Sequence, residues 1–132
     1  MNIKKIAVTS AFALLTVTAP LFAAQLTDQN KQFLAAYDQV HHALVADDLA
    51  SAKKAAADLG GSGKEVADSK SLDQARKAFT KVSTEAEKMA AGQSGYYVMH
   101  CPMKNADWVQ TDEKIANPYG GKDMLTCGAI KK

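Results

Sequence analysis

The chain has little of what enzymes and nucleic-acid-binding proteins usually need. Its 132 residues include two cysteines, three histidines and three prolines. It has no Cys-x-x-Cys redox motif, no glycine-rich phosphate-binding loop and no basic stripe of the kind that nucleic-acid-binding domains carry. A Cys-His nucleophile pair is conceivable, but no oxyanion hole or orienting acid is evident in the sequence. We therefore expect neither an enzyme nor a nucleic-acid-binding protein.

Long hydrophobic runs are absent except near the N-terminus. Lys4 and Lys5 precede an uncharged apolar stretch at residues 6–22, and the small residues Ala23 and Ala24 follow it. This layout is typical of a secretory signal peptide. We predict a leader at residues 1–24 that is cleaved near Ala24, which makes the mature protein periplasmic. The alternative is an uncleaved membrane anchor, but the run is short for a membrane span. We expect no stable membrane insertion after cleavage.

The remaining chain, residues 25–132, has almost no net charge. The sequence contains 16 lysines and arginines against 14 acidic residues, and the leader accounts for the excess of two. This length is enough for one small domain with a modest core. Aromatic residues make up 7% of the chain, and alanine supplies much of its apolar content, which favours closely packed helices. We expect one domain with a helical part at residues 25–92 and a C-terminal segment at residues 93–132.

Apolar periodicity predicts a mainly α fold, a small bundle of about three helices. The first helix spans residues 27–46 with Thr27 as its N-cap, and an alanine-rich second helix spans residues 47–59. The sequence Gly-Gly-Ser-Gly at residues 60–63 indicates a flexible break. A capping box at Ser71 opens the third helix, which runs to about residue 91.

The helical period disappears after Gly95. Residues 96–99 and 108–110 have strand-like composition, and Asn-Pro-Tyr-Gly-Gly at residues 117–121 indicates a turn. We predict an irregular C-terminal segment that contains short strands and turns. Such a segment needs a further tie, and either a metal ion or a disulfide would supply it.

The C-terminal segment is rich in sulfur. It contains both cysteines and three of the five methionines, with Cys101 and Met103 near its start and Met124 and Cys127 near its end. Thiolate and thioether sulfur are soft donors that suit Cu(I), whereas methionine is a poor ligand for zinc. These four residues predict a site for Cu(I) or Ag(I). The alternative is a disulfide between the two cysteines with no metal, which would stabilise the fold by about 3.5 kcal/mol.

Adjacent histidines in the first predicted helix are candidates to join the sulfur ligands. His41 and His42 point about 100° apart on a helix, so we expect only one of them to reach a shared site. The third histidine, His100, neighbours Cys101 and faces away from it if that stretch is an extended strand.

Several blocks of the C-terminal segment resemble an uncharacterised bacterial periplasmic domain. The blocks are Cys101-Pro102-Met103, Trp108-Val109-Gln110, Asn117-Pro118-Tyr119-Gly120-Gly121 and Met124-Leu125-Thr126-Cys127-Gly128. That domain occurs alone and also appended to adaptor subunits of copper/silver-type heavy-metal efflux pumps. The helical part is similar too, so the resemblance covers nearly the whole mature chain. The stretch between the first two blocks is shorter here than is usual in the family.

The resemblance implies copper or silver handling, with an efflux adaptor or pump as partner. Together with the sulfur pattern, it leads us to expect a periplasmic protein that buffers Cu(I) or Ag(I) or delivers it to an efflux system. The alternative is a disulfide-stapled interaction module that docks on a membrane or efflux partner and binds no metal.

Overall fold

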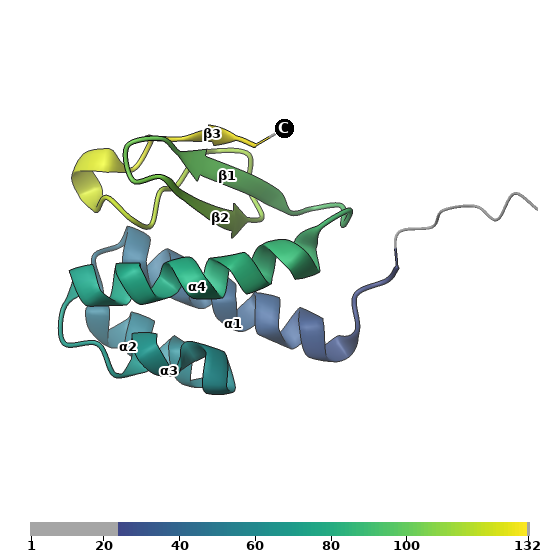
Figure 1. Ribbon diagram of the computed structural model, residues 1–132, viewed down its shortest axis with the longest axis horizontal. Coiled ribbons are helices and arrows are strands. Elements are labelled where there is room, and N and C mark those ends of the chain that lie inside the picture. The colour runs from purple at the N-terminus through teal and green to yellow at the C-terminus, as the bar shows by residue number, and fades with distance from the viewer. Residues whose placement is uncertain (1–23, 132) are drawn as a thin grey trace, which may run out of the picture.

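The computed structural model describes residues 24–131, so the predicted leader lies outside the described residues except for Ala24. The protein is built in three layers (Figure 1). Two long helices, α1 (Asp28–Val45) and α4 (Leu72–Ala90), form the middle layer. A small sheet covers one side of them, and the short helices α2 (Leu49–Ala57) and α3 (Lys64–Ala67) cover the other. No helix within residues 24–131 is both long enough and apolar enough to cross a membrane.

Helix α1 begins where the sequence predicts. The Thr27 side chain accepts a hydrogen bond of 3.1 Å from the backbone N–H of Asn30, which satisfies one of the free donors at the helix start. Its inner face buries Leu34, Tyr37 and Val40. The predicted boundaries, 27–46, are confirmed to within one residue at each end.

Helix α2 is shorter than the predicted 47–59 at both ends, and its start is later because Asp47 is not helical. Asp47 has a φ of 58°, and Asp48 is the N-cap instead, accepting from the Ser51 N–H at 3.0 Å. The Asp47 carboxylate pairs with Arg76 of α4. The Arg76 Nε also donates to the Pro118 carbonyl at 2.9 Å. This arginine therefore ties the corner between α1 and α2 to the C-terminal segment.

The glycine-rich stretch is ordered and is not the flexible break that its composition suggests. It forms a 3-10 turn, η1 (Gly60–Gly63), that leads directly into α3. Gly63 is buried, and a Cβ atom there would lie 1.9 Å from the Ala56 carbonyl oxygen. Glycine is thus needed at this position for close packing. With α3 added, residues 24–131 contain four α-helices where about three were predicted.

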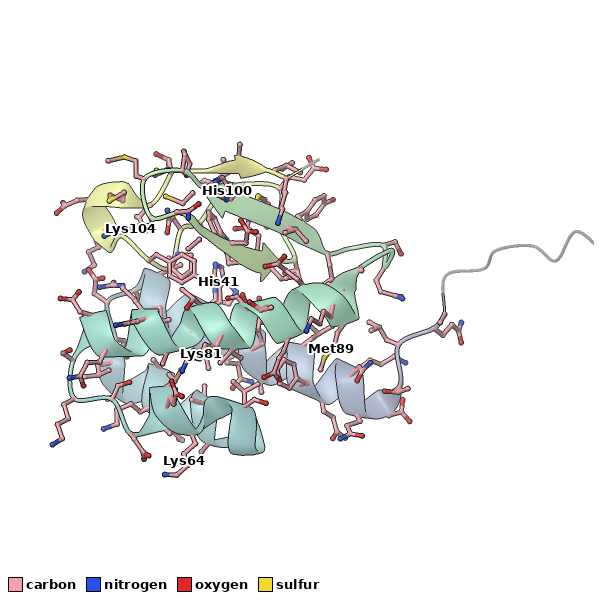
Figure 2. The ribbon with its side chains drawn as sticks, viewed as in Figure 1. His41, Lys64, Lys81, Met89, His100 and Lys104 are labelled. Carbon is pink, nitrogen blue, oxygen red and sulfur yellow. The ribbon has the colours of Figure 1, made fainter. Side chains whose placement is uncertain are left out.

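Helix α4 is strongly amphipathic and starts at the predicted Ser71 N-cap. The Ser71 side chain accepts from the Gln74 N–H at 3.2 Å, but the Gln74 side chain accepts from the Lys70 N–H, so the capping box is half formed. The predicted apolar stripe faces the core, with Phe79 and Val82 almost fully buried. The lysines of α4 are exposed, and Lys81, labelled in Figure 2, pairs with Glu65 of α3 at 2.8 Å.

The C-terminal segment forms one antiparallel sheet with the strand order β2-β1-β3. The strands are β1 (Tyr97–Cys101), β2 (Ala106–Gln110) and β3 (Ala129–Ile130). Met99 lies opposite Trp108 on one side and Ile130 on the other, and Met99, Cys101 and Trp108 are fully buried. The first two strands confirm the predicted positions, whereas β3 was not predicted. The fold is thus mainly α, as expected, but its C-terminal part is more regular than predicted.

A buried chain of hydroxyl groups joins the helices to the sheet. Ser83 Oγ lies 2.8 Å from the hydroxyls of both Tyr37 and Tyr119. Tyr119 donates to the Asp107 carbonyl at 2.6 Å, and the Val109 N–H donates to Tyr37 at 3.1 Å. Burial raises the pKa of both tyrosines, so both hydroxyls keep their protons. This network holds the sheet and the 117–121 turn at fixed positions over α1 and α4.

Candidate functional site

The structure brings the two cysteines together. Cys101 is the last residue of β1 and is fully buried, and Cys127 lies just before β3, which pairs with β1. Their Sγ atoms are not bonded and lie 3.2 Å apart. Two thiolates on one tetrahedral ion, with metal–sulfur bonds of about 2.3 Å, lie about 3.8 Å apart. A small opening of the pair would therefore admit an ion, whereas a closing movement together with an external oxidant, which takes two electrons and two protons, would form a disulfide.

The two thiols differ in acidity. Burial raises the pKa of Cys101, but hydrogen bonds from the Cys127 thiol, the Lys104 and Met103 backbone N–H groups and the Asn117 side chain outweigh it and lower the pKa. The hydrogen bond to Cys101, together with burial, raises the pKa of Cys127. Cys101 is therefore the more acidic thiol of the pair, the one that ionises more readily. The thiolate is the form that binds metals and reacts with disulfides.

Asn117 positions the cysteine pair, a role that sequence analysis missed. Its buried side chain donates from Nδ2 to the Cys127 carbonyl at 2.7 Å, and its Oδ1 accepts from the Tyr119 N–H at 2.8 Å. Its own N–H donates to the Leu125 carbonyl at 2.8 Å. These bonds fasten the predicted 117–121 turn to the segment that ends at Cys127. The available signal was an asparagine directly before proline, which is a common turn-forming pair.

The methionines differ in how they stand relative to the sulfur pair. Met103 follows Cys101 by two residues, its backbone N–H helps to lower the pKa of both cysteines, and its side chain is 76% exposed. Met124 is partly buried over Gly120, where an added Cβ would lie 2.9 Å from the Met124 Sδ. Met103 is thus the more accessible of the two thioethers, and Met124 is the one held by packing.

The adjacent histidines cluster with Asp38. Asp38, His41 and His42 each offer a ligand atom, and these atoms all lie within 4.8 Å of one another. Among residues 24–131, no histidine forms a group of this kind with the two cysteines. One of the two histidines was expected to join the sulfur ligands, but both lie beside the Asp38 carboxylate instead. Asp38 was missed from the sequence, although its spacing of three and four residues from the histidines places all three on one side of a helix.

His41 is buried between the helices and the sheet (Figure 2), with 1% of its surface exposed. Its Nε2 lies 2.7 Å from the Ala116 carbonyl oxygen. Because a carbonyl can only accept, Nε2 carries the proton and Nδ1 holds a lone pair. Nδ1 is the one buried side-chain nitrogen or oxygen within residues 24–131 that has no hydrogen-bond partner. Burial lowers the pKa of His41, so the ring is neutral at neutral pH.

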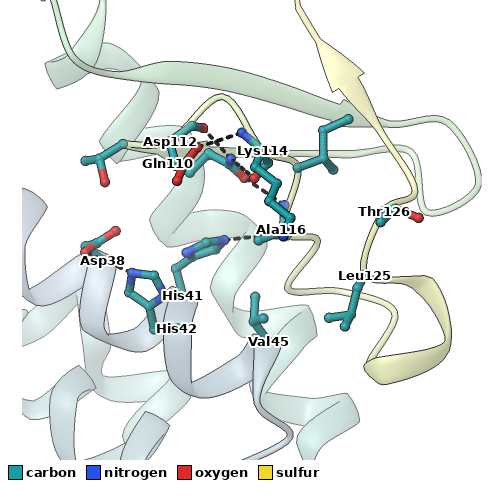
Figure 3. Close-up of a pocket in the computed structure, with 12 residues that line it drawn as sticks. Asp38, His41, His42, Val45, Gln110, Asp112, Lys114, Ala116, Leu125 and Thr126 are labelled. Carbon is teal, nitrogen blue, oxygen red and sulfur yellow. Dashed lines mark hydrogen bonds and ion pairs between the residues drawn. The ribbon is translucent and has the colours of Figure 1, made fainter.

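A cavity of about 410 Å³ opens in front of these residues (Figure 3). Asp38, His41 and His42 form its helical wall, and the loop that follows β2 forms the opposite wall. The His42 Nε2 lies 3.3 Å from Asp38 Oδ2. In Figure 3 the free nitrogen of His41 points toward the other two side chains.

His100 faces away from Cys101, as predicted from strand alternation. Its Nδ1 lies 2.5 Å from the Asp107 Oδ1, and Asp107 also pairs with Lys131. His100 is therefore engaged in a polar network with Asp107 on the sheet and belongs to neither cluster.

Comparison with known proteins finds no relative: no protein family, curated protein or solved structure matches the chain.

Proposed function

We propose that the protein is a periplasmic soft-metal-binding protein that holds Cu(I) or Ag(I) between Cys101 and Cys127. It buffers the ion or delivers it to an efflux system, and it carries out no catalysis. The observation that carries the proposal is the pairing of the two sulfur atoms, 3.2 Å apart, with Cys101 favoured as the thiolate. The compartment and the efflux partner follow from the leader-like N-terminus and from the family resemblance.

Sulfur chemistry supports a soft monovalent ion. Thiolates and thioethers select Cu(I), and a site with these donors serves zinc less well. The hydrogen bonds to Cys101 favour its ionised form, so the pair is prepared for a cation without a large rearrangement.

Met103 is the preferred third ligand. Its side chain is 76% exposed, a methionine has three rotatable bonds, and it lies only two residues from Cys101. Met124 remains a candidate, but its packing over Gly120 opposes the movement. His41 and His42 leave this ligand set because they gather around Asp38.

A second candidate function is the disulfide-stapled interaction module without metal. The proximity of the two sulfurs supports it as well, because thiols 3.2 Å apart can close to the roughly 2.05 Å of a disulfide once an oxidant removes two electrons and two protons. Disulfides also persist in exported proteins. In this case an efflux or membrane partner would be recognised by the folded surface alone.

Counting free thiols separates the two functions. The protein is released from the periplasm into a thiol-blocking reagent, without oxidant, and its mass is measured. Two blocked thiols, or a Cu(I) adduct, support metal binding. An intact protein with no free thiols supports the stapled module and overturns the metal proposal.

Competitive Cu(I) titration of the reduced protein tests the ligands. Met103→Leu should weaken Cu(I) binding by about tenfold or more, and Met124→Leu should weaken it less. Leucine has nearly the same volume as methionine, so neither change should cost more than about 1.5 kcal/mol of stability. Met89→Leu, on α4, is the matched control and should bind as the wild type does. Absence of stoichiometric binding by the reduced wild type would contradict the proposal.

A further inference from the structure

We propose that Asp38, His41 and His42 form a second metal site, for a divalent first-row transition-metal ion such as Zn(II). This site is separate from the cysteine pair, takes a different class of ion, and does not depend on the function proposed above.

The three side chains already stand at ligand spacing. They come from one stretch of α1, at positions separated by three and four residues, and their ligand atoms lie within 4.8 Å of one another. Ligands of a tetrahedral Zn(II) ion at about 2.0–2.1 Å are about 3.3 Å apart. The His42 Nε2 and the Asp38 Oδ2 are separated by 3.3 Å. An ion would therefore need little movement of these two groups.

The state of His41 points independently to a ligand. Its Nε2–H is held by the Ala116 carbonyl at 2.7 Å, which leaves the Nδ1 lone pair free. Metal-bound histidines commonly donate their second nitrogen to a backbone carbonyl in this way, which fixes the ring orientation and tautomer. The ring is 1% exposed, and Nδ1 has no hydrogen-bond partner. A buried polar atom without a partner needs an explanation, and an ion at this position supplies one.

The cavity favours an ion with an open coordination position. Its volume of about 410 Å³ leaves room beyond the three ligands for water or an exogenous ligand. Val45, Ile115 and Leu125 provide apolar wall.

The donor set selects the class of ion. Two imidazole nitrogens and a carboxylate oxygen suit Zn(II), Cu(II) or Ni(II), whereas soft monovalent ions prefer sulfur. Three protein ligands with one open position are the arrangement of zinc sites that exchange a ligand.

Imidazole nitrogen resonances provide a site-specific test. Zn(II) is titrated into the ¹⁵N-labelled exported protein, and the side-chain resonances of its histidines are followed. We expect the His41 Nδ1 resonance to shift and to saturate at one equivalent of Zn(II), with the Nε2 proton retained. The His100 resonances should not move. A His41 Nδ1 resonance that is unchanged at saturating Zn(II) would overturn the proposal.

Three variants complete the test, with affinity read from the same His41 resonance. His42→Ala removes a largely exposed ligand, and Asp38→Asn alters a partly exposed one. Each should weaken Zn(II) binding by at least about tenfold, because loss of a group that only supports a metal ligand already costs about that much. His100→Ala removes a histidine outside the cluster and should leave the affinity unchanged. Wild-type affinity in the first two variants, or an equal loss in the third, would show that the cluster is not the site.

Discussion

Replacing Asn117 with alanine should destabilise the protein by about 2–4 kcal/mol. The change removes the bonds from Nδ2 to the Cys127 carbonyl and from the Tyr119 N–H to Oδ1. A buried group left without a partner costs about 1–3 kcal/mol, and an ordinary hydrogen bond contributes about 1 kcal/mol. The buried Tyr119 N–H bears the larger loss, since the partly exposed Cys127 can turn to water. Because 1 kcal/mol shifts the Tm of a domain this size by about 4 °C, the Tm should fall by about 8–16 °C.

The same variant should alter the reactivity of the cysteine pair. Asn117 donates a hydrogen bond that helps to lower the pKa of Cys101, so its loss should raise that pKa. Thermal melting followed by circular dichroism gives the Tm, and the pH dependence of alkylation of the reduced protein gives the thiol pKa. Thr126→Ala, at an exposed residue of the same region, is the control and should change stability by less than about 0.5 kcal/mol. A wild-type Tm and an unmoved alkylation midpoint in Asn117→Ala would refute the positioning role.

Three further outcomes are expected. Burial lowers the folded-state pKa of His41, so the buried neutral ring contributes stability above the unfolded pKa of about 6.5, and this stability is lost as pH falls. The Tm should therefore drop between about pH 7.5 and about pH 5.5. The drop should be smaller in His41→Gln. In urea unfolding, Gly128→Ala should cost about 1–3 kcal/mol, since the new Cβ would lie 2.7 Å from a buried tryptophan ring at a φ of 148°; Gly61→Ala, which meets open space, should be neutral or slightly stabilising. Changing Cys101 and Cys127 together to serine should speed hydrogen exchange in the sheet and leave most helical signal intact, and unchanged exchange would show that the sheet needs no sulfur tie.

Local signals predicted the helices well and failed where distant contacts decide the backbone. Thr27 and Ser71 cap their helices through side chains only three residues away, which a sequence displays directly. Asp47 leaves the helix and pairs with Arg76, a partner 29 residues away. Gly63 is required by its close contact with Ala56, so the glycine-rich composition of residues 60–63 wrongly suggested a flexible break. The two-residue strand β3 is too short to carry a pattern of its own.

The candidate sites also contain features that the sequence could predict and features that it could not. The proximity of Cys101 and Cys127 was foreseen because each stands in a distinctive sulfur-containing block. Asp38 could have been found, since its spacing from the two histidines is a helical one. The role of the Ala116 carbonyl could not be predicted from the sequence. Its contact with His41 joins residues 75 positions apart, and every residue has a backbone carbonyl, so no residue type marks it.

The dipeptide Ala116-Asn117 contacts both candidate sites. The carbonyl of the first residue holds the His41 ring, and the side chain of the second holds the carbonyl of Cys127. If an ion at the first site strained the bond between His41 and the Ala116 carbonyl, the strain would fall on the same short stretch of backbone that holds the Cys127 carbonyl. If occupancy of one site changes the affinity of the other, thermodynamic linkage requires the effect to be equal in both directions. A divalent ion and a monovalent ion would then regulate each other's binding in a protein small enough for one stretch of main chain to touch both.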